Sequence, residues 1–78
     1  MKIDWHDYIV TDKDIIDGKP IFNGTRLSVE FITGLFASGW SKKEILKNYP
    51  KLKEKNLQAM NIFIYECMKD SLMFKLPK

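Results

Sequence analysis

The chain has 78 residues, of which 45% are hydrophobic, and its formal net charge is +3. This length allows one domain, residues 1–78, and the hydrophobic fraction excludes a disordered chain. The single cysteine excludes an internal disulfide framework and a cysteine-rich zinc site. Because a core of this size contributes only about 3–5 kcal/mol to stability, we expect the chain to form a homodimer.

The sequence contains no signal for export or membrane insertion. Its first residues carry no apolar segment of the secretory type, and no apolar run approaches the ~20 residues of a membrane span. Together with the lone thiol, these features predict a cytoplasmic protein that does not contact membranes. His6 is the only histidine, and no glycine-rich phosphate loop is present. We therefore expect no metal site, no cofactor and no enzymatic activity.

Charge is distributed unevenly along the chain. Residues 1–30 hold four basic and six acidic residues, whereas residues 31–78 hold nine lysines and four acidic residues. Six of these lysines fall in one short window: Lys42, Lys43, Lys47, Lys51, Lys53 and Lys55. Such a cluster attracts phosphate groups or acidic protein surfaces. A solvated, lysine-rich helix surface is an equal alternative.

Turn residues and short apolar runs predict a small β-hairpin within about residues 8–28. Residues 8–10 read as a strand, and residues 15–16 as a second extended piece. The Asn23-Gly24 pair lies between two apolar runs. It is typical of a type I′ turn, in which both central residues have positive φ.

A first helix is predicted over about residues 29–38. Ser28 is a suitable N-cap, and apolar residues recur at helical spacing after it. Gly34 costs about 1 kcal/mol in a helix interior, which suggests that it marks a close packing contact. Gly39 is placed to end the helix in a left-handed conformation.

Two further helices are predicted over about residues 42–48 and 54–72. Ser41 and Glu44 have the spacing of a capping box. Pro50 disfavours helical geometry at the preceding residue and so ends the first of these two helices. A medium, a very short and a long helix follow the hairpin, which is the outline of a mainly α helix-turn-helix fold.

The long helix becomes apolar almost all round in its second half, which favours a subunit interface. The candidate interface residues, continuing into the C-terminal segment, are Phe63, Ile64, Cys67, Met68, Met73 and Phe74. The alternative is that these residues belong to the core of one subunit. Because Cys67 lies on the apolar stripe, we expect a buried, inert thiol.

Three motifs in fixed order resemble the domain-of-unknown-function 433 (DUF433) family over about residues 9–65. Residues 16–29 resemble its opening GKP…GTR segment, residues 39–46 its capped G-x-S…E-I-L step, and residues 49–52 its Y-P-x-L turn. The resemblance implies a homeodomain-like helix-turn-helix fold, often dimeric. It also implies an antitoxin of the VapB type, paired with a PIN-like ribonuclease toxin. The family's threonine cap on the last helix is absent here, where residues 53–57 carry extra lysines.

In this fold the start of the last helix enters the major groove of DNA. Lys51, Lys53 and Lys55 are predicted to neutralise phosphates, while Asn56 and Gln58, with Ala59 beside them, are placed to read adenine edges. Lys42, Lys43 and Lys47 are predicted to contact the DNA backbone. The alternative is that all of these residues simply face solvent.

Arg26 is the only arginine, and it follows Thr25 in the GTR motif. Its planar fork suits a phosphate, a partner carboxylate or backbone carbonyls. A bond that locks the hairpin onto the helices is the favoured interpretation. Two functions stay open: a dimeric DNA-binding antitoxin and autoregulator, and a module that binds a partner protein without specific DNA binding.

Overall fold

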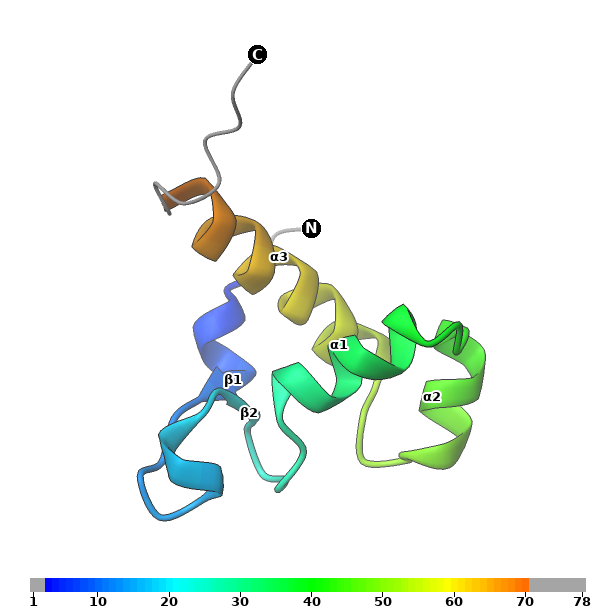
Figure 1. Cartoon of the computed structure of the whole chain (residues 1–78), viewed down its shortest axis with the longest axis horizontal. Coiled ribbons are helices and arrows are strands. Elements are labelled where there is room, and N and C mark those ends of the chain that lie inside the picture. The colour runs from blue at the N-terminus through cyan, green and yellow to red at the C-terminus, as the bar shows by residue number, and fades with distance from the viewer. Residues whose placement is uncertain (1–2, 71–78) are drawn as a thin grey trace.

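The computed structural model describes residues 3–70 as a small N-terminal sheet followed by three helices (Figure 1). Two single turns of 3-10 type accompany the strands, and the elements in chain order are η1 (Trp5–Asp7), β1 (Ile9–Val10), η2 (Ile16–Gly18), β2 (Ile21–Phe22), α1 (Val29–Ala37), α2 (Lys42–Asn48) and α3 (Glu54–Asp70). The predicted mainly helical fold with an N-terminal hairpin is confirmed. Each helix begins at the predicted residue, and residues 71 and 72 of the predicted last helix lie outside the described residues.

The two strands form a small sheet whose two faces differ in their surroundings. They pair antiparallel, with Ile9 opposite Phe22 and Val10 opposite Ile21. Because alternate residues of a strand point to opposite faces, one face presents Ile9 and Phe22 to the main core. The other face carries Val10 and Ile21, and Ile21 is 2% exposed although it is not part of the core cluster.

The Asn23-Gly24 turn differs from the type I′ turn that the sequence suggests. Gly24 has φ 83°, but Asn23 is not among the residues with positive φ. The Thr25 amide donates to the Phe22 carbonyl at 3.0 Å, so the four residues match a type II turn. The pairing resumes only where the Phe22 amide donates to the Leu27 carbonyl at 2.9 Å.

The predicted extended piece at residues 15–16 is wrong at its second residue. Ile15 is extended, but Ile16, Asp17 and Gly18 all have positive φ, at 50°, 55° and 77°. Hydrogen bonds from Gly18 and Lys19 to the carbonyls of Ile15 and Ile16 close this left-handed turn. A β-branched residue is strained in this region, and the turn sets Ile16 in solvent at 42% exposure.

Helix α1 is capped as predicted, and two of its apolar residues are buried. The Phe31 amide donates to the Ser28 hydroxyl at 2.9 Å, and Gly39 has φ 101° after the helix ends. Only Val29 and Ile32 are buried on this helix. The interpretation of Gly34 as a packing contact is wrong, because a Cβ built there meets no atom within 4 Å.

Helices α2 and α3 begin with two different caps. The Ser41 hydroxyl accepts from the Glu44 amide at 3.1 Å, and the Glu44 carboxylate accepts from the Ser41 amide at 2.8 Å, which confirms the capping box. At α3, the Asn56 side chain accepts from the Lys53 amide at 2.8 Å. Asn56 therefore satisfies one of the free amides that the missing threonine leaves.

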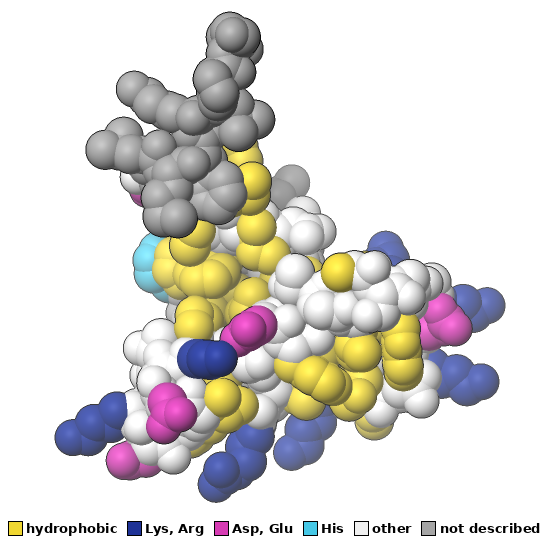
Figure 2. All heavy atoms as spheres, in the orientation of Figure 1, with side chains coloured by type: hydrophobic (Ala, Val, Ile, Leu, Met, Phe, Trp, Pro, Cys, Tyr) yellow, Lys and Arg dark blue, Asp and Glu magenta, His cyan; other side chains and the backbone are white. Residues whose placement is uncertain are grey.

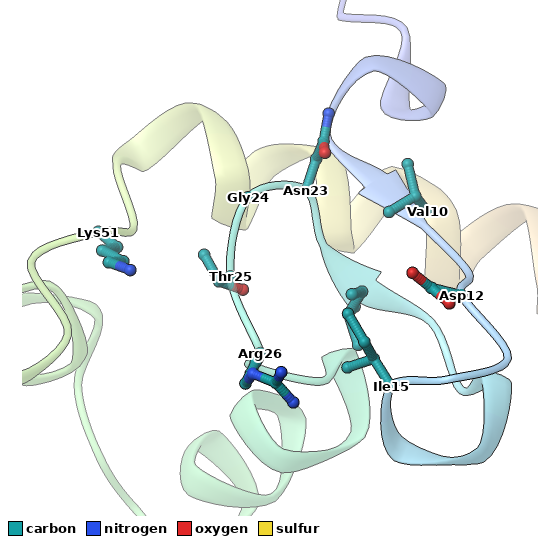
Figure 3. A pocket seen from close by; sticks show the side chains of 9 residues that line it. Val10, Asp12, Ile15, Asn23, Gly24, Thr25, Arg26 and Lys51 are labelled. Atoms are coloured by element: carbon teal, nitrogen blue, oxygen red, sulfur yellow. The ribbon is translucent and has the colours of Figure 1, made fainter.

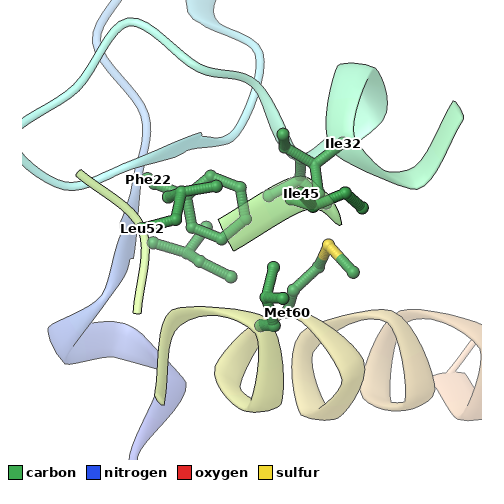
Figure 4. Packing of buried hydrophobic residues seen from close by; sticks show 8 residues of the cluster. Phe22, Ile32, Ile45, Leu52 and Met60 are labelled. Atoms are coloured by element: carbon green, nitrogen blue, oxygen red, sulfur yellow. The ribbon is translucent and has the colours of Figure 1, made fainter. Parts of the chain in front are cut away.

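The core joins the sheet to all three helices (Figure 4). Its largest fully buried side chains are Phe22, Ile32, Ile45, Leu52 and Met60. Helix α3 also packs against η1 and β1, where the Trp5 indole donates to Glu66 at 3.1 Å and meets the Phe63 ring edge-on at 4.8 Å. Among residues 3–70, no helix combines the length and apolar character needed to cross a membrane.

Candidate functional site

A tight turn fixes the start of α3 beside α2. The Leu52 amide donates to the Tyr49 carbonyl at 2.9 Å, and the Leu52 side chain is 1% exposed. Tyr49 also meets Phe31 of α1 edge-on, at 5.8 Å between ring centroids. The turn is therefore anchored in the core, and the residues that flank Leu52 face solvent.

All six clustered lysines lie on the surface of α2, the turn and the start of α3. Lys42, Lys43 and Lys47 belong to α2, Lys51 and Lys53 flank Leu52, and Lys55 lies in the first turn of α3; all six are exposed. Figure 2 shows basic side chains projecting from the end of the molecule that carries α2. The fold thus leaves all six clustered lysines accessible to solvent on α2, the turn and the first turn of α3.

Both acidic residues in the lysine cluster are already engaged. Lys42 pairs with Glu54 across the turn, with its Nζ 2.7 Å from the carboxylate. This hydrogen bond lowers the pKa of Glu54 below its usual value, and the Ser41 amide in the capping box lowers the pKa of Glu44. Within residues 3–70 the other five lysines of the cluster make no ion pair. Five of the six clustered lysines are therefore without a carboxylate partner in this part of the chain.

The first turns of α3 expose polar side chains along one face. Glu54, Gln58 and Asn61 recur at helical spacing, and with Phe36, Lys42 and Leu57 they line a groove of about 250 Å³. Asn61 was missed at the sequence level, although its position three residues after Gln58 places both on one helix face. We refer to Gln58 and Asn61 as the polar stripe.

Two neighbours of Gln58 are less available than the sequence suggests. The Asn56 side chain is half-buried, and its oxygen accepts the cap hydrogen bond from Lys53. Ala59 is 0% exposed and belongs to the core side of α3. Because adenine recognition uses both the oxygen and the nitrogen of an amide side chain, Gln58 and Asn61 are the better-placed pair.

Thr25 and Arg26 have separate roles. The Thr25 hydroxyl donates to the Phe22 carbonyl at 2.8 Å and accepts from the Leu27 amide at 3.0 Å, so it holds the loop together. The expected bond from Arg26 to the helices does not form: its side chain is exposed, and within the described chain it makes no hydrogen bond or ion pair. Arg26 and Lys51 instead border a hollow of about 390 Å³ (Figure 3).

Comparison with protein families matches residues 9–63 to the family described as "Protein of unknown function (DUF433)". The chain belongs to the DUF433 family. No curated protein and no solved structure matches it. The DUF433 match runs from β1 to the middle of α3, so it contains the lysine cluster, the polar stripe and the Arg26 hollow.

The last seven described residues, beyond the DUF433 match, include an exposed apolar face of α3. Tyr65 and Met68 are 64% and 47% exposed and continue the line of the polar stripe along the helix. We refer to Tyr65 and Met68 as the apolar rear of α3. Tyr65 was not among the predicted interface residues, although its spacing from Met68 places both on one face.

The predicted interface residues divide into three groups. Phe63 and Ile64 are half-buried and pack against the core, which supports the alternative that they belong to one subunit. Cys67 is exposed, so the expected burial of its thiol is wrong, and Met68 is exposed beside it. Met73 and Phe74 lie outside the described residues.

Within residues 3–70, no group of three potential ligands from histidine, cysteine, aspartate and glutamate could hold a metal ion. His6, the only histidine, stacks on Trp5 at 3.7 Å and pairs with Asp4 at 2.7 Å.

Proposed function

We propose that this chain is a dimeric, DNA-binding, antitoxin-like autoregulator with a homeodomain-like helix-turn-helix fold. In this proposal α2, the Leu52 turn and α3 form the helix-turn-helix unit. The observation that carries it is the set of five exposed lysines, without ion pairs in residues 3–70, on α2, the Leu52 turn and the first turn of α3, followed along α3 by the polar stripe. Such a surface combines phosphate neutralisation with side chains that can read base edges.

Each part of the surface has an assigned role. Lys43 and Lys47 contact the DNA backbone from α2, and Lys51, Lys53 and Lys55 contact it around the start of α3. The polar stripe reads bases in the major groove. The apolar rear of α3 is covered by a second copy, so that two such units meet half-sites about one helical turn apart.

A DNA-binding titration at several salt concentrations tests the backbone contacts. Replacing Lys53 and Lys55 with alanine should weaken binding to every duplex. It should also reduce the slope of log affinity against log salt by about 2, because each lost phosphate contact removes about one counterion. Replacing Lys13, an exposed lysine outside this surface, should leave the slope unchanged. An unaltered slope in the double variant would contradict the proposed interface.

A second titration tests base recognition by the polar stripe. It compares DNA from upstream of the chain's own gene with a shuffled duplex of the same composition. Gln58→Ala and Asn61→Ala should each reduce the preference for the upstream duplex, by about fivefold or more, while binding to the shuffled duplex stays the same. Equal affinity of the unaltered protein for both duplexes would argue against an autoregulator.

The toxin part of the proposal follows from the family resemblance and assigns the hairpin half to a PIN-like ribonuclease. A short reading frame of that type beside the gene, and a stable complex of the two purified proteins, are the expected results.

The second candidate function is a protein-binding module without specific DNA binding. The hollow beside Arg26 favours it, because this side chain is exposed and unpaired in the described chain.

A further inference from the structure

The hollow beside Arg26 is built on the sheet face that turns away from the core. Val10 and Ile21 lie side by side there in the strand register, and Ile15, from the loop that follows β1, lines the same hollow. Val10 and Ile15 are half-buried, so they offer apolar surface that the main core does not use. The hollow has a volume of about 390 Å³ and is open to solvent on one side.

Positive charge borders one part of this apolar floor. Arg26 from the loop 23–26 and Lys51 from the α2–α3 turn both line the hollow, while Asp12 lies on the side away from Lys51, beside Val10 (Figure 3). Asp12 already accepts a hydrogen bond from the Asp14 amide at 2.9 Å. Arg26 and Lys51 make no ion pair within residues 3–70. The hollow therefore has two available cations and one acid that is partly satisfied within its own loop.

We propose that this hollow holds an acidic side chain of a partner protein, next to an aliphatic side chain that covers Val10 and Ile15. Arg26 donates two parallel hydrogen bonds to the carboxylate, a geometry that suits its planar fork, and Lys51 adds a point charge. This inference deepens the partner-binding part of the proposed function by naming the chemistry of the contact.

The lining favours a protein segment over the DNA backbone or a free small molecule. A phosphodiester has no aliphatic group to cover Val10 and Ile15. A small molecule usually has most of its surface buried in its site, whereas this hollow is open. A segment of a partner needs only one side covered, because the rest of the interface surrounds it.

NMR titration of the ¹⁵N-labelled full chain tests the proposal with two peptides. The probe is acetyl-Gly-Leu-Glu-Leu-Gly-amide, and the matched control has glutamine in place of the glutamate. The glutamate peptide should move the amide signals of Ile15, Lys51 and residues 23–26, with a dissociation constant in the millimolar range. The glutamine peptide should bind about tenfold more weakly, because it lacks the charge-assisted hydrogen bonds.

Variants separate the hollow from the general positive charge of the surface. Arg26→Gln and Lys51→Gln should each lower affinity for the glutamate peptide about tenfold. Lys13→Gln, which removes a charge outside the lining, should not lower it. Arg26 makes no contact that the fold requires, so an unchanged pattern of amide signals elsewhere confirms that the variant is folded.

Three results would overturn the proposal: equal binding of both peptides, no signal change in the hollow up to about 5 mM peptide, or full binding by Arg26→Gln. A fourth is that inorganic phosphate or duplex DNA, and not the peptide, moves these signals in an Arg26-dependent way.

If the peptide does not bind, DNA binding that depends on Lys53 and Lys55 but not on Arg26 would leave the proposed function intact. Peptide binding without DNA binding would support the proposed partner site in the hollow and refute the DNA-binding proposal.

Discussion

Gly34 and Gly39 lie in equally open surroundings but differ in backbone conformation. A Cβ built at either position meets no atom within 4 Å, yet only Gly39 has a positive φ, of 101°. Glycine inside a helix costs about 0.5–1 kcal/mol relative to alanine. At a left-handed position, by contrast, any side chain is strained. The same substitution should therefore have opposite effects at the two residues.

Gly34→Ala should raise the free energy of unfolding by about 1 kcal/mol and the Tm by about 4–8 °C. Gly39→Ala should lower the free energy of unfolding by about 1 kcal/mol. Urea denaturation followed by circular dichroism measures both changes at equal protein concentration. A loss of stability in Gly34→Ala would contradict this prediction and would mean that a second subunit packs against Gly34.

Ile16 shows how a strained residue can be kept in place. Its φ of 50° is unfavourable for a β-branched side chain, but the turn around it is closed by two backbone hydrogen bonds. Lys19, just after the turn, is tied to α1 by its 2.8 Å pair with Glu30. The loop that carries Ile15 to the hollow is therefore held at its C-terminal end.

At the scale of elements, the start of α2 depends on a reciprocal cap. The Ser41–Glu44 box satisfies amides that no helix turn can reach. Its hydrogen bonds to Ser41 hold the pKa of Glu44 below the usual value of 4.5. A carboxylate whose pKa is lower in the folded state contributes stability above its unfolded pKa, and this contribution is lost as pH falls through the folded pKa.

We predict that part of the acid sensitivity of the fold comes from Glu44. The free energy of unfolding should fall as the pH drops below about 4.5, and Glu44→Gln should make that decline shallower. Ser41→Ala should cost about 1 kcal/mol at neutral pH but should keep most of the acid-dependent contribution, because the backbone amide that donates to Glu44 remains. The measurement is urea denaturation at a series of pH values, and an unchanged pH profile in Glu44→Gln would contradict the assignment.

At the scale of the whole molecule, α3 changes character along one exposed face. Its front half carries the polar stripe, and its rear carries Tyr65 and Met68 at 64% and 47% exposure. Exposed aromatic and methionine side chains are typical of the centres of protein interfaces. In the proposed function, the front half of α3 contacts DNA and the apolar rear contacts a second copy.

Tyr65→Ser combined with Met68→Ser should raise the dissociation constant of the dimer at least about tenfold. Both side chains are already exposed, so the subunit should stay folded. Phe36→Ser is the matched control, because it removes an apolar side chain of 36% exposure from α1 and should leave the dimer intact. Sedimentation equilibrium checks all three proteins, and a folded wild-type monomer at micromolar concentration would refute the dimer.

The sequence by itself determined the order and starts of the helices, their caps and the clustering of the lysines. These features depend on local rules: Ser28 and Ser41 satisfy nearby amides, Gly39 accepts a left-handed backbone, and Pro50 stops a helix. They involve residues at most a few positions apart, so the spacing in the chain is sufficient to predict them.

Only the tertiary structure decided which apolar and polar residues remain available. Ile21 is buried outside the core cluster because β1 pairs with β2. Cys67 is exposed although it lies on the same helix face as Phe63, which packs against Trp5 one turn earlier. Arg26 and Lys51 are 25 positions apart in the chain, so their shared hollow exists only once the turn folds back toward the sheet. Burial depends on contacts between distant segments, and a local sequence pattern does not contain them.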